Sequence, residues 1–192
     1  MDGLNESVSI AVEELSSLEQ SRESAIACSR RVIRLTKTVI HDIHTGSDPE
    51  GHLSELEELM KTMHGLCDKP LIECSGPVQD AMGEYAEAVI LYSIIKDRPI
   101  PNYMDLGITA GTWILGLADS EGELRRAIMS ELMDGNLDDA KRLFSKMESV
   151  HELVMLLDVP DAISPIRRKQ DIARGIMDKT RSDITTASIM HR

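Results

Sequence analysis

The apolar positions of the chain recur three and four residues apart, which is the spacing of an amphipathic helix, and few segments alternate as a half-buried strand would. Turn and cap signals separate the pattern into six long segments, so we predict an all-α protein, a single bundle of six to seven helices spanning residues 1–192. The expected helices are 5–44, 49–67, 77–96, 109–133, 137–158 and 165–188.

The boundaries follow from local chemistry. Gly46 suits the left-handed residue that ends a helix, and Asp48-Pro49 suits the start of the next one. Two prolines make 97–101 a rigid, extended connector, because proline removes a backbone donor and restricts the residue before it. The first segment, 5–44, is unusually long, and its apolar stripe predicts packing against the bundle along its length. That stripe comprises Val8, Val12 or Ala11, Leu15, Leu18, Ala25, Val32, Val39 and Ile43.

Composition supports one helical domain. The chain has 192 residues, 11 of them Met, but only one Phe, one Trp and three Tyr. No apolar run approaches 18 residues and no signal segment precedes the first helix, so we expect a cytoplasmic protein without a membrane span. Cys28, Cys67 and Cys74 are odd in number and lack CxxC spacing, which predicts buried or idle thiols in a reducing compartment.

The formal net charge of −12 argues against a nucleic-acid partner. However, ten of the 21 Lys and Arg residues fall in two short segments, and local potential decides where a phosphate backbone binds. These residues are Arg30, Arg31, Arg34 and Lys37, then Arg167, Arg168, Lys169, Arg174, Lys179 and Arg181. The first group, extended by His41, predicts a phosphate-binding line on one helix face; the alternative is a solvated face. His44, His52 and His64 show no ligand spacing and are expected on the surface.

Two pairs of acids offer candidate chemistry. Glu84 and Glu87 are three residues apart and Asp119 and Glu123 are four apart, so each pair shares one helix face. With 33 acidic residues such pairs arise by chance about ten times, and what distinguishes these is their apolar surroundings. Two such helices side by side would converge four carboxylates, which predicts a divalent cation between them; ion pairing to Arg or Lys is the alternative. Oxygen-only ligands favour Mg²⁺ or Mn²⁺.

The segments around these acids resemble a known family. Residues 83–88 read Gly-Glu-Tyr-Ala-Glu-Ala, and 115–126 read Leu-Gly-Leu-Ala-Asp-Ser-Glu-Gly-Glu-Leu-Arg-Arg. They are similar to motifs of the translin family, in particular its translin-associated factor X branch, and the whole resembles a stand-alone archaeal-type member. The likeness covers most of the chain and is loosest before about residue 20 and across 45–75.

The resemblance implies an elongated seven-helix subunit that assembles into a closed homo-oligomeric shell, usually an octamer. It implies binding of single-stranded RNA, and of single-stranded DNA as well, and a Mg²⁺-dependent endoribonuclease site. Carried over by position, the catalytic and metal-binding residues would be Glu84, Glu87, Asp119 and Glu123, and Arg126 also matches the family motif. We expect nucleic acid to contact Arg30, Arg31, Arg34, Lys37 and Arg126.

Two other functions stay open at this point. One is a translin-like shell that binds single-stranded RNA or DNA and whose acids are structural. The other is an all-α, Mg²⁺-dependent nucleotide pyrophosphohydrolase, although the Glu-Glu-x-x-Glu and Glu-x-x-Asp strings that such enzymes resemble are absent from the motif positions. A ferritin-like di-iron site is disfavoured, because no His follows these acids three residues later.

Overall fold

Seven α-helices and no strand make up residues 3–190, the part of the chain that the computed structural model describes. The all-α prediction is confirmed. The single addition is a one-turn helix with Pro70 in its first turn, where proline is tolerated because the donor it lacks would be unpaired. The helices are α1 Leu4–Thr45, α2 Glu50–Leu66, α3 Pro70–Glu73, α4 Gly76–Ile95, α5 Ala110–Met133, α6 Leu137–Met155 and α7 Ile166–Met190.

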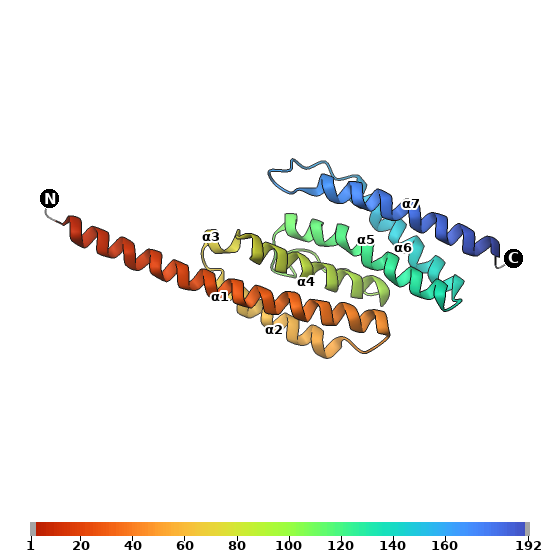
Figure 1. The fold of residues 1–192 in the computed structure, drawn as a ribbon, viewed down its shortest axis with the longest axis horizontal. Coiled ribbons are helices and arrows are strands. Elements are labelled where there is room, and N and C mark those ends of the chain that lie inside the picture. Colours follow the sequence, from red (N-terminus) through yellow and green to blue (C-terminus); the bar gives the residue numbers. More distant parts are fainter. Residues whose placement is uncertain (1–2, 191–192) are drawn as a thin grey trace.

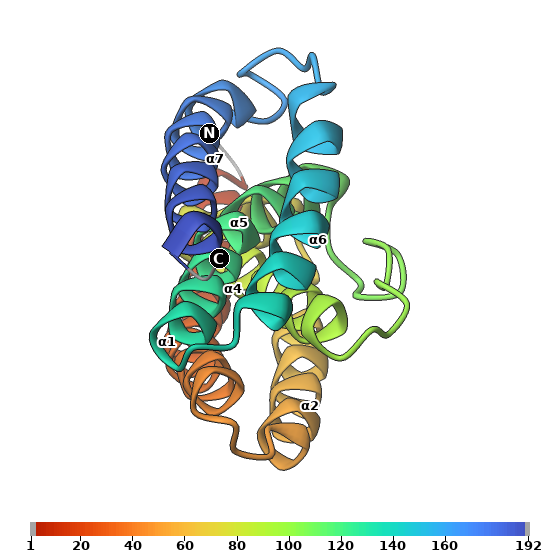
Figure 2. The ribbon, with the colours of Figure 1, turned by 90° about the vertical axis from the view of Figure 1, so that its right-hand side faces the viewer.

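The long helices are stacked in pairs. Helix α1 packs on α2 and α4, α4 packs on α5, and α5 packs on both α6 and α7. Figure 2 shows the result end-on, with α1 and α2 at one end of the stack, α4 and α5 in the middle, and α6 and α7 at the other end. Helices α4 and α5 are therefore the central pair, and residues on their facing sides lie deep in the molecule.

Helix α4 is the most apolar element, and its buried residues point in nearly every direction. This agrees with its position, because α1, α3 and α5 all contact it. Its buried side chains include Val78, Ala81, Met82, Tyr85, Ala86, Ala88, Ile90, Leu91 and Ile94. Glu84 and Glu87 are therefore two carboxylates on a core helix.

Small residues let α4 and α5 come unusually close. A Cβ added to Gly116 of α5 would lie 2.7 Å from the Ala86 Cβ, 2.8 Å from the Gly83 carbonyl oxygen and 3.0 Å from the Glu87 nitrogen, all in α4. Two of these three atoms are backbone, which cannot move aside as a flexible side chain can. Gly116 thus fixes the separation of the central helices.

The N-terminal part of α1 lies outside the bundle. Figure 1 shows this part of the helix extending well beyond the other elements. Val8 and Leu15 are 53% and 63% exposed, and the first buried residue of α1 is Ala25. The prediction that the apolar stripe packs along the whole helix is therefore wrong before about residue 18. The physical reason is that no described helix of the chain runs alongside this segment.

Two further expectations can be compared with the structure. Cys28, Cys67 and Cys74 are all free thiols, and they are buried, partly buried and exposed respectively. Within residues 3–190, none of the helices combines the length and the apolar character needed to cross a membrane.

The role of Gly116 can be tested by one methyl group. Gly116→Ala should lower the free energy of unfolding by about 1–3 kcal/mol, because the helices must separate to admit the Cβ. Gly175→Ala in α7 is the matched control, since no atom lies within 4 Å of its added Cβ. There, removal of a helical glycine should stabilise the protein by up to about 1 kcal/mol. Urea unfolding of both variants measures the difference; equal effects would contradict the close approach.

Candidate functional site

The four predicted acids lie on the central helices, around the close approach at Gly116. Glu84 and Glu87 are one turn apart in α4, and the Glu87 backbone is the one that Gly116 approaches. Asp119 and Glu123 follow Gly116 by one and two turns on the same face of α5. The third acid of this segment, Glu121, faces the other way and contacts His151 of α6 at 2.9 Å. Helical spacing thus distinguishes the paired acids from their neighbour.

Glu87 shows that the acids interact. Burial, the main cause, and the negative charges of Asp119, Glu84 and Glu123 together raise its pKa from an ordinary 4.5 to about 8. Burial likewise raises the pKa of Glu84; Lys37 of α1 opposes this shift, and Asp119 adds to it. Glu87 has no hydrogen-bond or ion-pair partner among the described residues. The four acids are therefore electrostatically coupled, with Glu87 at the centre.

Asp119 is paired with a cation from α7. The Lys169 ammonium lies 2.5 and 2.7 Å from the two carboxylate oxygens of Asp119. Lys169 belongs to the basic segment found in the sequence, but nothing in the sequence connected it with Asp119. Only the packing of α7 on α5 brings the two side chains together.

Glu123 is held by α1. The Nε2 of His44 lies 2.5 Å from Oε2 of Glu123, and Nη1 of Arg126 lies 3.5 Å from the same oxygen. The hydrogen bond with His44 is the main cause that lowers the pKa of Glu123. The expectation that His44 is a surface residue is wrong, because its side chain is only 6% exposed. His44 comes seven residues after Lys37, on the same helix face, and this spacing was the available signal.

The other two histidines differ. His52 is 45% exposed and contacts Asp42, as a surface residue can. His64 is partly buried, and its Nε2 has no hydrogen-bond partner within residues 3–190, so the surface expectation fails there as well. The loop before α5 covers it, with the imidazole against Gly107.

The donor chemistry of the site fits a hard divalent cation. The carboxylates of Asp119, Glu84 and Glu123 add to the rise in the pKa of Glu87 that burial causes, and a cation among these acids would counter their repulsion. In the described residues, however, no three His, Cys, Asp or Glu side chains are arranged as metal ligands. Asp119 instead forms an ion pair with Lys169, and Glu123 forms one with Arg126, as the alternative interpretation of the sequence expected. A bound divalent cation and ion pairs to basic side chains are two ways of neutralising the same carboxylates.

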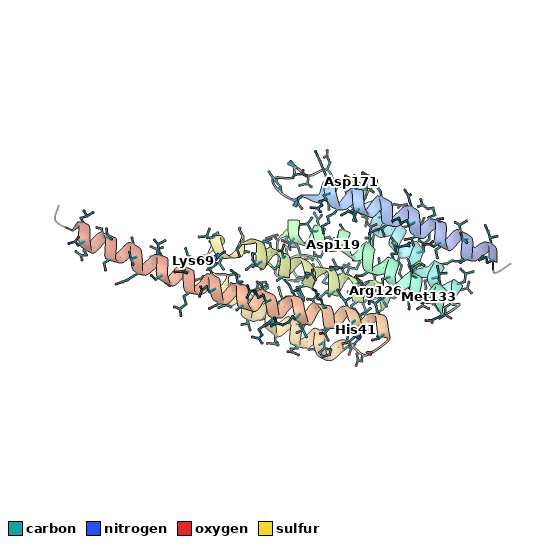
Figure 3. The ribbon with its side chains drawn as sticks, in the orientation of Figure 1. His41, Lys69, Asp119, Arg126, Met133 and Asp171 are labelled. Atoms are coloured by element: carbon teal, nitrogen blue, oxygen red, sulfur yellow. The ribbon has the colours of Figure 1, made fainter. Side chains whose placement is uncertain are left out.

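Two clefts open beside the acids. One, of about 480 Å³, is lined by residues of α1, α4, α5 and α7, among them Glu84, Asp119 and Lys169. The other, of about 540 Å³, lies between α1 and α5 and includes His41, His44 and Arg126. Figure 3 shows Asp119 and Arg126 along α5, with His41 on the neighbouring part of α1. Clefts of this volume accommodate small ligands of nucleotide size.

The structure divides the predicted basic line between two surfaces. Lys37 interacts with Glu84, and Arg126 lies beside Glu123, so both border the acids. Exposed Arg30 precedes Lys37 by seven residues and shares its helix face. In contrast, Arg31 and Arg34 line a smaller cleft, of about 260 Å³, between α1 and α2.

The fold defines the structural class, and comparisons with known proteins agree with it. No family model matches the chain. AfC3PO superposes with a TM-score of 0.88 at 29% identity, covering 95% of this chain and 97% of that chain. Apo-NeC3PO gives 0.83 at 27% identity, covering 94% and 96%. An AfC3PO–duplex RNA complex gives 0.76 at 28% identity, covering 95% and 97%. These are C3PO proteins of the translin family.

A sequence relative places the chain more closely. An uncharacterized protein of Methanocaldococcus jannaschii is 35% identical over 190 residues, which are 97% of this chain and 83% of that protein. The chain belongs to the same family as this archaeal protein, and its structural neighbours are C3PO proteins of the translin family. The resemblance seen in the sequence is confirmed at this level, and assignment to the factor X branch stays a prediction.

The raised pKa of Glu87 predicts how stability depends on pH. Since the folded pKa of about 8 exceeds the ordinary 4.5, stabilisation from protonated Glu87 is complete below about pH 4.5 and is lost as pH rises through about 8. Without divalent cations, Glu87→Gln should therefore change stability little at pH 5. At pH 9 it should raise it by roughly 2–4 kcal/mol, since a tenfold change in a protonation equilibrium is about 1.4 kcal/mol.

Urea unfolding in EDTA at the two pH values measures this effect. Glu152→Gln is the control, because Glu152 is an exposed carboxylate of α6, outside the site. A Glu87→Gln variant that parallels the control at both pH values would show that Glu87 is not coupled to the other acids.

Proposed function

We propose that this protein binds RNA and cleaves it as a divalent-metal-dependent endoribonuclease. The observation that carries the proposal is Glu87, a partly buried carboxylate that has no hydrogen-bond or ion-pair partner within residues 3–190 and lies among three other carboxylates. A fold maintains such an arrangement at a cost, because like charges in a low-dielectric setting repel. A bound cation would remove that cost and make the site useful.

Glu84, Glu87, Asp119 and Glu123 would hold Mg²⁺, or Mn²⁺, as oxygen ligands. When bound, such a cation activates water and neutralises charge on a phosphodiester. The chain contributes the rest: the close contact at Gly116 fixes the spacing of the two ligand helices, and His44 orients Glu123. Arg126, beside Glu123 and more than half exposed, is placed to face the negative charge of the cleaved phosphate.

RNA as the substrate class is supported by the neighbour in complex with duplex RNA, which superposes over 95% of this chain. The resemblance of the motifs favours single-stranded RNA, with single-stranded DNA as a further ligand. The exposed cations Lys37 and Arg126 border the acids, and Arg30 lies two turns before Lys37 on the same face of α1, so a phosphate backbone bound to them would pass the metal ligands. This explains how a chain of net charge −12 can bind a polyanion.

A second candidate function has its own observation. The ion pair of Asp119 with Lys169 and the hydrogen bond of Glu123 with His44 leave two of the acids satisfied without any metal. A translin-like shell that binds nucleic acid and does not cut it would need nothing more. A nucleotide pyrophosphohydrolase is less well supported, since the neighbours that cover the whole chain are C3PO proteins.

Cleavage of labelled single-stranded RNA, with and without Mg²⁺ or Mn²⁺, tests the proposal. We expect internal cuts only with metal, and a loss of about 100-fold or more for Asp119→Asn or Glu87→Gln. RNA binding should persist or tighten in both variants, because repulsion of phosphate is relieved. Glu152→Gln should cut normally. Binding without cutting by the wild type would select the inactive shell, and hydrolysis of nucleoside triphosphates alone would select the pyrophosphohydrolase.

Charge reversals in α1 locate the bound RNA. Lys37→Glu should weaken binding with little sequence preference and flatten the salt dependence by about 0.7 per lost phosphate contact. Arg34→Glu reports on the separate cleft between α1 and α2. If Lys37→Glu binds and cuts RNA normally, the bound RNA does not pass the acids. If Arg34→Glu binds and cuts RNA normally, the cleft between α1 and α2 does not contact RNA.

We also propose that the chain forms a homo-oligomer, an octamer by resemblance, with the projecting part of α1 in an interface. Leu4, Val8, Val12 and Leu15 expose an apolar stripe there, of a kind that monomers rarely leave uncovered. A Val8→Glu/Leu15→Glu variant should therefore have a smaller mass in light scattering. Ile10→Glu/Ser17→Glu, on the opposite face, is the charge-matched control. A wild-type monomer at micromolar concentration would contradict the proposal.

A further inference from the structure

Lys169 occupies the position at which a cation would meet Asp119. Its ammonium lies within 2.7 Å of both carboxylate oxygens and therefore takes one acceptor site on each of them. Lys169 comes from α7, whereas Asp119 and the other three acids come from α5 and α4. The side chain is 34% exposed and lines the cleft of about 480 Å³, which gives it room to move away.

We infer that Lys169 is the internal counter-ion of the site and competes directly with the divalent cation for Asp119, so that it sets the metal affinity. The inference rests on the proposed metal site. In the metal-free protein the ammonium neutralises Asp119 and also opposes the charge on Glu84 and Glu87. A divalent cation that binds Asp119 must displace it, because two cations cannot contact the same pair of oxygens without strong repulsion.

A comparison with Lys146 of α6 shows how Lys169 differs from a lysine with a purely structural role. Lys146 of α6 also forms a short ion pair, 2.6 Å from the Asp97 carboxylate, and is partly buried. It lies away from the acids and also donates to the Ile94 carbonyl. Lys146 is therefore a matched structural lysine, whereas Lys169 pairs with a proposed metal ligand.

The test is Mn²⁺ binding to the full chain, measured by calorimetry for the wild type, Lys169→Met and Lys146→Met. Lys169→Met should bind Mn²⁺ about tenfold more tightly, because an internal competitor is gone. Lys146→Met should match the wild type, and Lys169→Arg should stay weak because the charge remains. Unchanged or weaker Mn²⁺ binding by Lys169→Met would overturn the inference, since a merely structural lysine would weaken the site when removed.

A measurement on the wild type avoids dependence on a folded variant. Acetic anhydride labels accessible lysine amines, and mass spectrometry reads each position separately. Labelling of Lys169 should be slow in EDTA and several-fold faster in saturating Mn²⁺, with Lys146 unchanged as the internal reference. Labelling of Lys169 that ignores Mn²⁺ would show that the ion pair persists and would overturn the inference.

RNA cleavage separates this inference from the proposed function. For Lys169→Met, the Mn²⁺ concentration that gives half-maximal cutting should fall by the same factor as the dissociation constant. Tighter Mn²⁺ binding without any RNA cutting would refute the nuclease while leaving the role of Lys169 intact. Normal RNA cutting by Lys169→Met with an unchanged Mn²⁺ requirement would support the nuclease and refute the role of Lys169. A wild type that binds no Mn²⁺ would refute both.

Discussion

Four carboxylates between two closely packed helices cannot all stay ionised without compensation, and much of this structure follows from that constraint. The contact at Gly116 brings α4 and α5 together, so the charges on their facing sides are partly removed from water. The charge of Glu84 is opposed by Lys37 of α1, and the other three acids are compensated in different ways. Glu87 is held towards its protonated form, Asp119 has an ammonium from α7, and Glu123 has an imidazole from α1. Positive charge is therefore supplied from both flanking layers.

The stacking order of the helices explains how the side chains of Lys37, His44 and Lys169 come to lie beside the acids. Because α4 and α5 are central, α1 covers one side of the acids and α7 another. Lys37 and His44 reach the site from a single face of α1, and Lys169 reaches it from α7. The arrangement gives an acidic centre with a basic border, which suits a site where metal and phosphate would have to meet.

Helix α1 has two physical characters along one continuous element. After Ala25 it is a core helix, buried against α2 and α4. Before that residue it carries apolar side chains into solvent, although its hydrophobic spacing does not change. A repeating apolar stripe indicates only that a helix face will be covered, and the cover can come from another chain. The apolar stripe therefore predicted the helix correctly, but the expectation that its N-terminal part packs against this chain's own bundle was wrong.

The sequence by itself determined the six long helices, their order and the two acid pairs, because helical periodicity, proline and cap residues act over a few neighbouring positions. It also singled out Glu84, Glu87, Asp119 and Glu123, since charges on an apolar face are unusual. It could not connect Lys169 with Asp119, or His44 with Glu123, which are 50 and 79 residues apart. Those contacts depend on how whole helices pack, and packing is decided by the fit of their surfaces, with Gly116 setting the distance at which the charges meet.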